Sequence, residues 1–180
     1  MDYYLSSILI NSGELKKRVR DIAAEISLEY NGQEIVVIGI LKGAVFFLAD
    51  LVRELSQDLK VIIDFMAVSS YGDSTKTSGI VRIIKDLDTH IQGKNVLIVE
   101  DIVDTGLTLS YLVKLLKERS PRSVKVCVLL DKTERRVVDV PLDFKGFEIP
   151  DRFVVGYGLD CAGLWRNLPD IMTVDQGQNP

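Results

Sequence analysis

The chain has 180 residues, of which 47% are hydrophobic, and its formal net charge is −4. These values suit one globular domain and exclude a largely disordered chain, while the acidic balance disfavours broad nucleic-acid binding. No apolar run approaches the ~20 residues of a membrane helix, and the N-terminus carries an acid where a secretory signal would be basic. We expect a soluble cytoplasmic protein. Its two cysteines, Cys127 and Cys161, lack metal-ligand spacing and are expected to be reduced.

Helical and extended patterns alternate along the chain. A helix is predicted after Asn11, because Glu14 completes a capping box and apolar residues then recur at helical spacing until Gly32. Residues 34–40 are nearly all apolar and β-branched, which is typical of a strand covered on both faces. A second helix follows, and then a strand over residues 60–70.

The alternation continues in the second half. Residues 96–99 and 123–130 read as buried strands, separated by a helix over residues 107–116. Shorter strands are predicted at residues 80–87, 153–157 and 171–174. This order predicts an α/β fold with a mostly parallel central sheet flanked by helices.

No repeat, low-complexity block or linker divides the chain, so residues 1–180 are expected to form a single domain. The segment after about residue 131 looks irregular. Together with the N-terminal residues, it is expected to form a small hood on the main sheet. The polar stretch Tyr71–Gly79 has no apolar periodicity and is interpreted as a mobile loop.

Polar residues follow three of the predicted strands. Lys42 and Gly43 follow the first, residues 100–108 follow the central strand, and Asp131 and Lys132 follow the next. Ligands bind beyond the carboxyl ends of strands in open parallel sheets. We therefore expect the three segments to meet at one rim and to form a binding site there.

A short loop enters the helix that follows the central strand. Its residues are Asp104, Thr105, Gly106, Leu107 and Thr108. Exposed amides and the helix dipole suit a phosphate at this point, and glycine lets the backbone approach it closely. A plain helix cap is an equal alternative, because Asp and Thr are both good capping residues.

Two adjacent acids, Glu100 and Asp101, end the apolar run before this loop. Acids beside a phosphate repel it unless a cation lies between them, and they accept hydrogen bonds from sugar hydroxyls. The combination predicts a phosphorylated sugar bound with Mg²⁺, which prefers oxygen ligands. The alternative is an acidic pair solvated at a strand end.

Other catalytic patterns are missing or weak. The chain contains neither G-x-x-x-x-G-K-[ST] nor G-x-G-x-x-G, which disfavours a P-loop or a dinucleotide fold. His90 is the only histidine and lies in a polar turn, so a Ser-His-Asp catalyst is not expected. The run "DKTERR" at residues 131–136 is interpreted mainly as a solvated turn, from which Lys132 could reach the rim.

The stretch "VLIVEDIVDTGLTL" resembles the phosphoribosyl pyrophosphate (PRPP) binding motif of the type I phosphoribosyltransferases. Further stretches between residues 39 and 171 resemble the compact bacterial hypoxanthine(-guanine) phosphoribosyltransferases: "LKGAVFFLADL", "SSYG", "LLDKTERR", "GFEIPDRFVVGYGLD" and "WRNLPDI". The resemblance implies a glycosyltransferase of purine salvage. It would transfer phosphoribose from PRPP to hypoxanthine or guanine, giving inosine or guanosine monophosphate (IMP or GMP) and pyrophosphate.

The resemblance also implies residue roles for the sugar and its phosphate groups. Glu100 and Asp101 would hold the ribose and Mg²⁺, and residues 104–108 would cradle the 5′-phosphate. Asp104 would act as general acid or base near the purine N7. Lys42, Gly43 and Arg166 would bind pyrophosphate, and the resemblance implies a cis peptide bond at Leu41–Lys42.

The purine would be bound by later segments. The resemblance implies that Phe153 stacks on the base, Val154 bonds its edge through the backbone, and Lys132 donates to the six-position oxygen. Asp160 would bind a second Mg²⁺ through its side chain and also belong to the purine site, because its region would lie near the guanine amino group. Without the resemblance, "RFVVGYG" is better interpreted as a strand with a core Phe.

Ser70 and Tyr71 match the start of the family's lid, so the 71–79 loop would close over the site and exclude water. Relatives commonly form homodimers or homotetramers, and no nucleic-acid or membrane partner is expected. One alternative is a PRPP-sensing regulator on the same fold, although the chain has no basic face or spare DNA-binding segment. A receiver-type signalling domain would leave the D-T-G-L-T loop unexplained. The preference among hypoxanthine, guanine and xanthine stays open.

Overall fold

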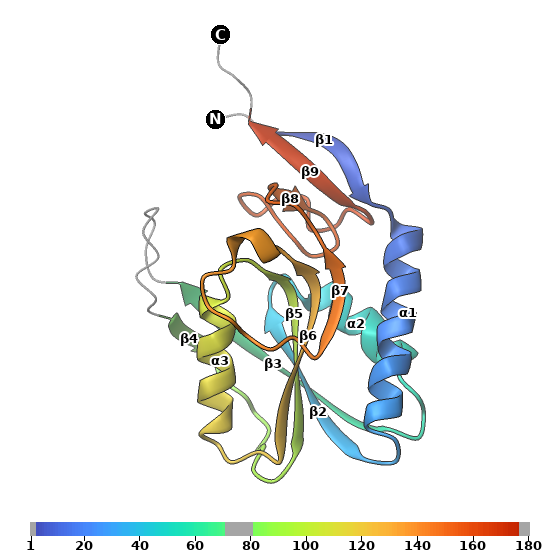
Figure 1. Ribbon diagram of the computed structural model, residues 1–180, viewed down its shortest axis with the longest axis vertical. Coiled ribbons are helices and arrows are strands. Elements are labelled where there is room, and N and C mark those ends of the chain that lie inside the picture. Colours follow the sequence, from blue (N-terminus) through green and yellow to red (C-terminus); the bar gives the residue numbers. More distant parts are fainter. Residues whose placement is uncertain (1–2, 71–80, 177–180) are drawn as a thin grey trace.

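The computed structural model describes residues 3–70 and 81–176. A six-stranded sheet with the strand order β4-β3-β2-β5-β6-β7 forms its centre (Figure 1). The strands are β2 (Glu34–Leu41), β3 (Lys60–Ser70), β4 (Val81–Lys85), β5 (Asn95–Val103), β6 (Ser123–Asp131) and β7 (Phe144–Glu148). Neighbouring strands pair in parallel, except for the antiparallel pair β3 and β4. The predicted α/β fold with a mostly parallel sheet is confirmed.

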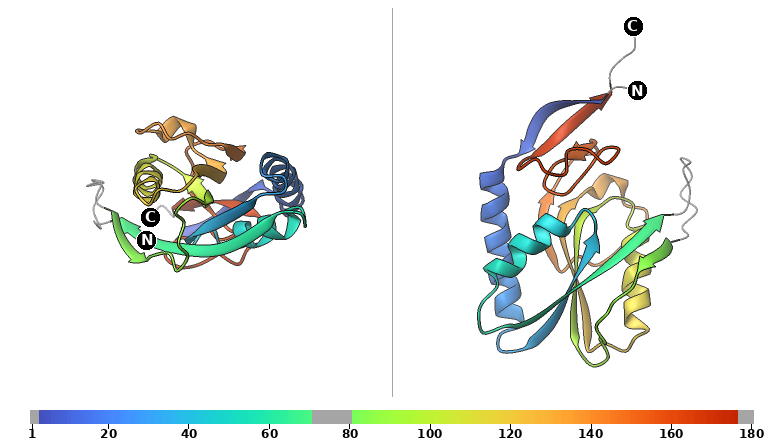
Figure 2. Two further views of the ribbon diagram at one scale, coloured as in Figure 1. Left: turned by 90° about the horizontal axis from the view of Figure 1, so that it is seen from below. Right: turned by 180° about the vertical axis from the view of Figure 1, so that it is seen from behind.

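Helices cover both faces of this sheet (Figure 2). They are α1 (Ser12–Glu29), α2 (Val45–Glu54) and α3 (Leu107–Lys117). Ile35 and Val37 of β2 pack in the core with α1 and α2, whereas Val36 and Ile38 pack with α3. Successive strand residues point to opposite faces, so a strand with a core on each side must be apolar at nearly every position.

Helix α1 begins as predicted. The Asn11 side chain accepts a hydrogen bond from the Glu14 amide at 3.0 Å, and the Glu14 carboxylate accepts one from the Asn11 amide at 2.9 Å. The helix buries one stripe at helical spacing: Leu15, Val19, Ile22, Ala23 and Ile26. It ends at Glu29, and Gly32, with φ +69°, turns the chain toward β2.

The central strand is longer than its apolar run. β5 continues to Val103, four residues past the predicted end, because β6 pairs with it as far as the Val103–Asp131 partners. Glu100 and Asp101 are therefore strand residues, and the loop begins only at Asp104.

A second sheet lies beyond the carboxyl end of the first. It contains β1 (Tyr3–Ile10), β9 (Ile171–Gln176) and β8 (Val154–Val155), in the order β1-β9-β8. Strand β1 was not predicted, and its partner β9 lies at the other end of the chain.

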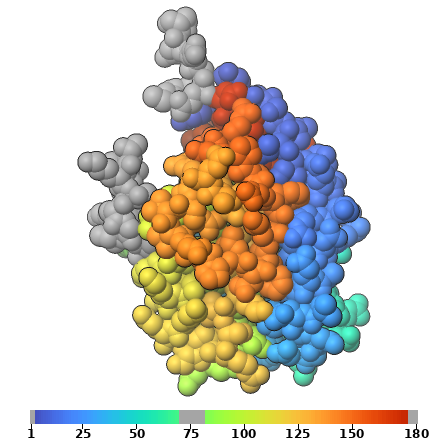
Figure 3. All heavy atoms as spheres, in the orientation of Figure 1, coloured from blue at the N-terminus to red at the C-terminus, as the bar shows by residue number. Residues whose placement is uncertain are grey.

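The segment after Asp131 is less irregular than expected, because residues 144–148 form β7 and extend the main sheet. In Figure 3 the chain around these residues covers the face between α3 and α1. A Cβ on Gly146 would lie 2.3 Å from the Leu129 carbonyl oxygen, so this strand carries glycine where sequence patterns favour a β-branched residue. Among the residues that the model describes, none of the helices has the length and apolar character of a membrane span.

Asp64 of β3 is a buried carboxylate that joins β3 to the turn after β4. It accepts hydrogen bonds from the amides of Phe65, Asp88 and Thr89 at 2.7–3.0 Å. Burial acts to raise the pKa of Asp64, but these hydrogen bonds outweigh it and hold the pKa below its usual value.

Asp64→Asn is expected to lower the free energy of unfolding by about 2 kcal/mol at neutral pH, because the substituted amide cannot accept all three bonds. A carboxylate with a lowered folded pKa stabilises the protein above its unfolded pKa, and this stabilisation disappears as the pH falls through the folded value. Urea unfolding at neutral pH and at about pH 3 checks this. The gap between wild type and variant should shrink in acid, whereas exposed Asp88→Asn should change little at either pH.

Candidate active site

The order of the main sheet reverses at β2. The chain passes from β2 to β3 on one side and later enters β5 on the other side of β2. Such a switch point opens a crevice at the carboxyl ends of the strands. Lys42 and Gly43 follow β2 there, Asp104 follows β5 and Lys132 follows β6. The structure thus brings the three predicted segments to one edge.

Gly43 is in direct contact with Asp101, one of the two acids. A Cβ at this position would lie 1.5 Å from Asp101 Oδ2, so only glycine lets the backbone approach this carboxylate. The peptide bond between Leu41 and Lys42 is cis, as the resemblance implied. The Asp101 side chain is 9% exposed and accepts a hydrogen bond from the Ile102 amide at 2.8 Å.

The two acids are held in an environment that resists their ionisation. Burial raises the pKa of Glu100 well above its usual range, and the Asp101 carboxylate beside it raises it further. Burial also raises the pKa of Asp101, although the nearby Arg166 guanidinium opposes that change. Asp101 is therefore not a solvated acid at a strand end, which was the alternative interpretation of the pair. Two adjacent carboxylates, of which Asp101 is buried, favour a cation between them and a phosphate.

The loop before α3 is built as an open cradle. Gly106 has φ +83°, and a Cβ there would lie 2.5 Å from the Val138 carbonyl oxygen. The Thr105 carbonyl accepts hydrogen bonds from the Val137 and Val138 amides at 3.0 and 3.1 Å, and these two bonds hold the loop against the segment after β6. A hollow of about 110 Å³ lies here, lined by residues 100, 102–106, 108 and 109.

Helix α3 starts without a side-chain cap. Its N-cap residue is Gly106, and no side chain bonds the first-turn amides from that position, in contrast to the full capping box of α1. The Thr105 hydroxyl accepts only a long 3.4 Å bond from the Leu107 amide. Helix amides left open in this way can bind an anion. The geometry favours the phosphate interpretation of the loop over the plain cap.

Asp104 has a partner that the sequence did not indicate. Arg135, in a short 3-10 turn after β6, places Nε 3.1 Å from Asp104 Oδ1. The pair lacks hydrogen-bond alignment, since Oδ1 has no hydrogen-bond partner. The run "DKTERR" is exposed at residues 133–135, as its interpretation as mainly a solvated turn expects, whereas Lys132 is buried and Arg136 contacts the buried Asp131 carboxylate.

Three candidate purine-binding residues surround the next part of the rim. Lys132 has a side chain that is only 8% exposed, with Nζ 3.4 Å from Asp151 Oδ1. Phe153 is 53% exposed, so it is not the core residue that the interpretation of "RFVVGYG" as a strand with a core Phe required. Its carbonyl accepts a hydrogen bond from the Val174 amide at 3.0 Å, and Val154 begins β8. An exposed ring and a buried ammonium are both groups that suit a planar polar ligand.

Arg166 and Asp160 form an ion pair, and the Arg166 guanidinium lies near Asp101. Arg166 Nη2 lies 2.6 Å from Asp160 Oδ1, and Nη1 donates to the Gly158 carbonyl at 2.6 Å. Asp160 Oδ2 also accepts a hydrogen bond from the Gly163 amide at 2.7 Å. Of the two lid residues, Tyr71 lies outside the described residues and Ser70 ends β3.

Comparison with known proteins identifies the family. A model described as the phosphoribosyl transferase domain matches residues 7–162. The chain is 51% identical to the hypoxanthine-guanine phosphoribosyltransferase of Bacillus subtilis, over 95% of this chain and 94% of the relative. The chain belongs to the hypoxanthine-guanine phosphoribosyltransferase family. The Aquifex aeolicus hypoxanthine-guanine phosphoribosyltransferase is likewise 51% identical, over 93% of this chain and 94% of the relative.

A solved hypoxanthine-guanine phosphoribosyltransferase from Bacillus anthracis has the same fold, with a TM-score of 0.90 and 45% identity. It covers 97% of this chain and 100% of its own, so the family likeness includes the second sheet as well as the main one. Arg166 lies beyond the matched phosphoribosyl transferase model but inside the region shared with this structure.

The family likeness raises the question of whether these residues suit a divalent cation. Among the described residues, no three Asp, Glu, His or Cys side chains cluster as a metal cage. Mg²⁺ is commonly held by one or two carboxylates, with substrate phosphates and water supplying its other ligands. The Glu100–Asp101 pair, in which Asp101 is buried, supplies two carboxylates of that kind.

Proposed function

We propose that this protein is a purine-salvage enzyme that transfers the 5-phosphoribosyl group of PRPP to hypoxanthine and to guanine. The products are IMP or GMP and pyrophosphate. The observation that carries the proposal is the juxtaposition, at the switch point, of an acidic pair whose pKa values are raised and a helix start at Gly106 that has no side-chain cap. The relatives at about half identity bear the names of this enzyme, which disfavours the regulatory alternative.

The acidic pair serves the reacting sugar. Breaking the bond at ribose C1 develops positive charge on the ring, as in glycoside cleavage. Glu100 and Asp101 hold the ribose hydroxyls and stabilise that charge electrostatically. They also hold Mg²⁺, which would neutralise the pyrophosphate leaving group when bound. Asp160 is a candidate ligand for a second Mg²⁺ once it exchanges its pairing with Arg166.

Two separate cradles hold the phosphate groups. Residues 104–108 bind the 5′-phosphate through the open amides of α3 and the Thr105 and Thr108 hydroxyls. Lys42, the Gly43 backbone and Arg166 bind pyrophosphate, and the planar Arg166 fork suits phosphate oxygens. Asp104, the first residue of the phosphate loop, transfers the proton at the purine N7. Arg135 restrains the Asp104 carboxylate.

The purine is recognised by Lys132, Phe153 and Val154. Phe153 stacks on the base and Val154 bonds its edge through the backbone. The Lys132 ammonium donates to a six-position carbonyl oxygen and meets only a donor in adenine. This selects 6-oxopurines. Ser70 and Tyr71 begin the lid that excludes water from the closed site.

The remaining proposals concern the whole chain. Residues 1–180 act as a single domain, with β1 and the segment after residue 131 as its hood. The enzyme works in the cytoplasm, where its buried free cysteines stay reduced. It assembles as a homodimer or homotetramer, for which the exposed Ile63 and Ile84 on neighbouring strands offer apolar surface. Light scattering after gel filtration would give the mass.

The function is tested by mixing the protein with PRPP, Mg²⁺ and one purine base and measuring nucleotide and pyrophosphate. Equal amounts of IMP and pyrophosphate are expected with hypoxanthine, GMP with guanine, and little product with adenine. Chelation of Mg²⁺ should stop the reaction. PRPP binding without nucleotide formation from either 6-oxopurine would instead support a sensor.

Lys132→Met should raise KM for hypoxanthine by roughly 100-fold, because the variant keeps the apolar stem but leaves the purine oxygen without its charged donor. Discrimination against adenine should weaken in parallel. Steady-state kinetics with both bases measures this, and Lys117→Met on the exposed end of α3 is the matched control. An unaltered ratio of kcat/KM between hypoxanthine and adenine would remove Lys132 from base recognition.

A further inference from the structure

Closely packed backbone segments around Gly43 and Gly158 connect Asp101 with α2. Gly43 lies against the Asp101 carboxylate, and Gly158 lies against Gly43 on the other side. A Cβ on Gly158 would lie 2.0 Å from the Gly43 carbonyl oxygen. With no slack between these groups, the position of Gly158 limits where Gly43 and Asp101 can lie.

The turn that carries Gly158 has an uncommon backbone. Gly156, Tyr157 and Gly158 have φ values of +97°, +49° and +105°. A tyrosine rarely adopts a positive φ, so its surroundings must hold it there. The same turn is tied to the crevice by Arg166, whose carbonyl accepts a hydrogen bond from the Gly158 amide at 2.9 Å and whose guanidinium donates to the Gly158 carbonyl.

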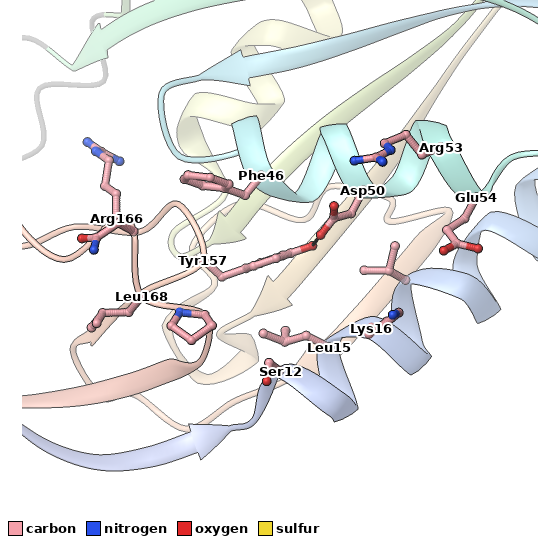
Figure 4. Close-up of a pocket in the computed structure, with 13 residues that line it drawn as sticks. Ser12, Leu15, Lys16, Phe46, Asp50, Arg53, Glu54, Tyr157, Arg166 and Leu168 are labelled. Atoms are coloured by element: carbon pink, nitrogen blue, oxygen red, sulfur yellow. Dashed lines mark hydrogen bonds between the residues drawn. The ribbon is translucent and has the colours of Figure 1, made fainter.

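The outer support of the turn is the side chain of Tyr157. Its hydroxyl donates to Asp50 Oδ2 on α2 at 2.6 Å, and its ring lies 6.5 Å from that of Phe46 on the same helix. Figure 4 shows the tyrosine reaching from the turn to α2 and forming one wall of a cavity of about 500 Å³ that Arg166 also lines. Burial, and then the Asp50 carboxylate, raise the pKa of Tyr157, so the hydroxyl keeps its proton.

We propose that Tyr157 is a positioning residue, whose hydrogen bond to Asp50 holds the Gly158 turn, and through it Gly43 and Arg166, in place for the pyrophosphate of PRPP. This deepens the proposed function and rests on it. Tyr157 itself does not lie among the groups assigned to substrate. Helix α2 follows the Lys42–Gly43 segment in the chain. The hydrogen bond between Tyr157 and Asp50 therefore connects α2 to the Gly158 turn, and that turn contacts Gly43.

Tyr157→Phe removes only the hydroxyl. The variant should raise KM for PRPP roughly tenfold, the effect of losing one hydrogen bond to a charged group. KM for hypoxanthine should change less than about twofold, because the Gly158 turn contacts Gly43 and Arg166, which are assigned to pyrophosphate. Asp50→Ala should reproduce this split, and the double variant should be no worse than either single one. Asp50→Asn keeps an oxygen acceptor and should restore a KM for PRPP close to that of wild type.

Tyr30→Phe removes the hydroxyl of another buried tyrosine, remote from the crevice at the end of α1, and serves as the control. Thermal unfolding of each variant separates positioning from stability. A lowered melting temperature with both KM values unchanged, or equal rises in both KM values, would overturn the proposal. Failure of the wild type to form IMP would instead overturn the proposed function, so the two failures are distinguishable.

Discussion

Asp104→Asn is expected to lower kcat by roughly 100- to 1,000-fold, the range typical of losing a general acid or base. The asparagine keeps the size of the side chain but cannot exchange a proton with the purine N7. PRPP affinity should change little, because the phosphate loop binds through backbone amides and hydroxyls. Single-turnover kinetics with hypoxanthine gives the chemical rate, and isothermal titration with PRPP and Mg²⁺ gives the affinity.

Because Asp104 is paired with Arg135, Asp104→Asn also removes a negative charge beside that guanidinium, and the control must remove the same charge elsewhere. Asp139→Asn, an exposed change in the segment that follows, removes the same charge without touching the loop and should be nearly silent. If turnover by Asp104→Asn matched the wild type, the proton-transfer role would be wrong. If PRPP affinity fell as far as kcat, Asp104 would be a binding residue only.

Gly43→Ala should reduce kcat/KM by at least roughly 100-fold, the cost of displacing reacting groups by about 1 Å. The added Cβ would overlap Asp101 Oδ2, from which it would lie 1.5 Å away, so the carboxylate or the β2–α2 turn must move. Either movement separates groups that we assign to pyrophosphate from those that we assign to ribose. Steady-state kinetics against both substrates measures the loss.

Gly13→Ala is the matched control, because it adds the same methyl group in the first turn of α1, where the nearest atom is Asn11 Oδ1 at 3.1 Å. Circular dichroism should show that Gly43→Ala stays folded, since the overlap concerns a side chain at the rim and not the core. An active Gly43→Ala enzyme would show that close contact between Gly43 and Asp101 is dispensable.

The main sheet was predictable from the sequence because its signals are local. β2 and β6 are apolar at nearly every position, and that pattern has few explanations other than a strand covered on both faces. β1 carried no such signal, since most of it is exposed and its partner β9 is about 160 residues away. The end of β5 was misplaced because pairing with β6 depends on registry between strands, which apolar periodicity does not report.

The candidate site was predictable where it follows strand ends. Lys42, Glu100, Asp101 and Lys132 were found because parallel strands bring their carboxyl ends to one edge. Whether the 104–108 loop is a plain cap was not decidable, because Asp and Thr serve both purposes, and the absence of a side-chain cap at Gly106 now separates them. Partners distant in sequence, such as Arg135 for Asp104, leave no mark in any single segment.

We propose that the ends of β2, β5 and β6 form one site for PRPP and a 6-oxopurine. A crystal structure with IMP, pyrophosphate and Mg²⁺ would locate each ligand. We expect the 5′-phosphate on residues 104–108, the base between Phe153 and Lys132, and pyrophosphate on Gly43 and Arg166. A nucleotide bound with its phosphate away from the start of α3 would show that this assignment is wrong.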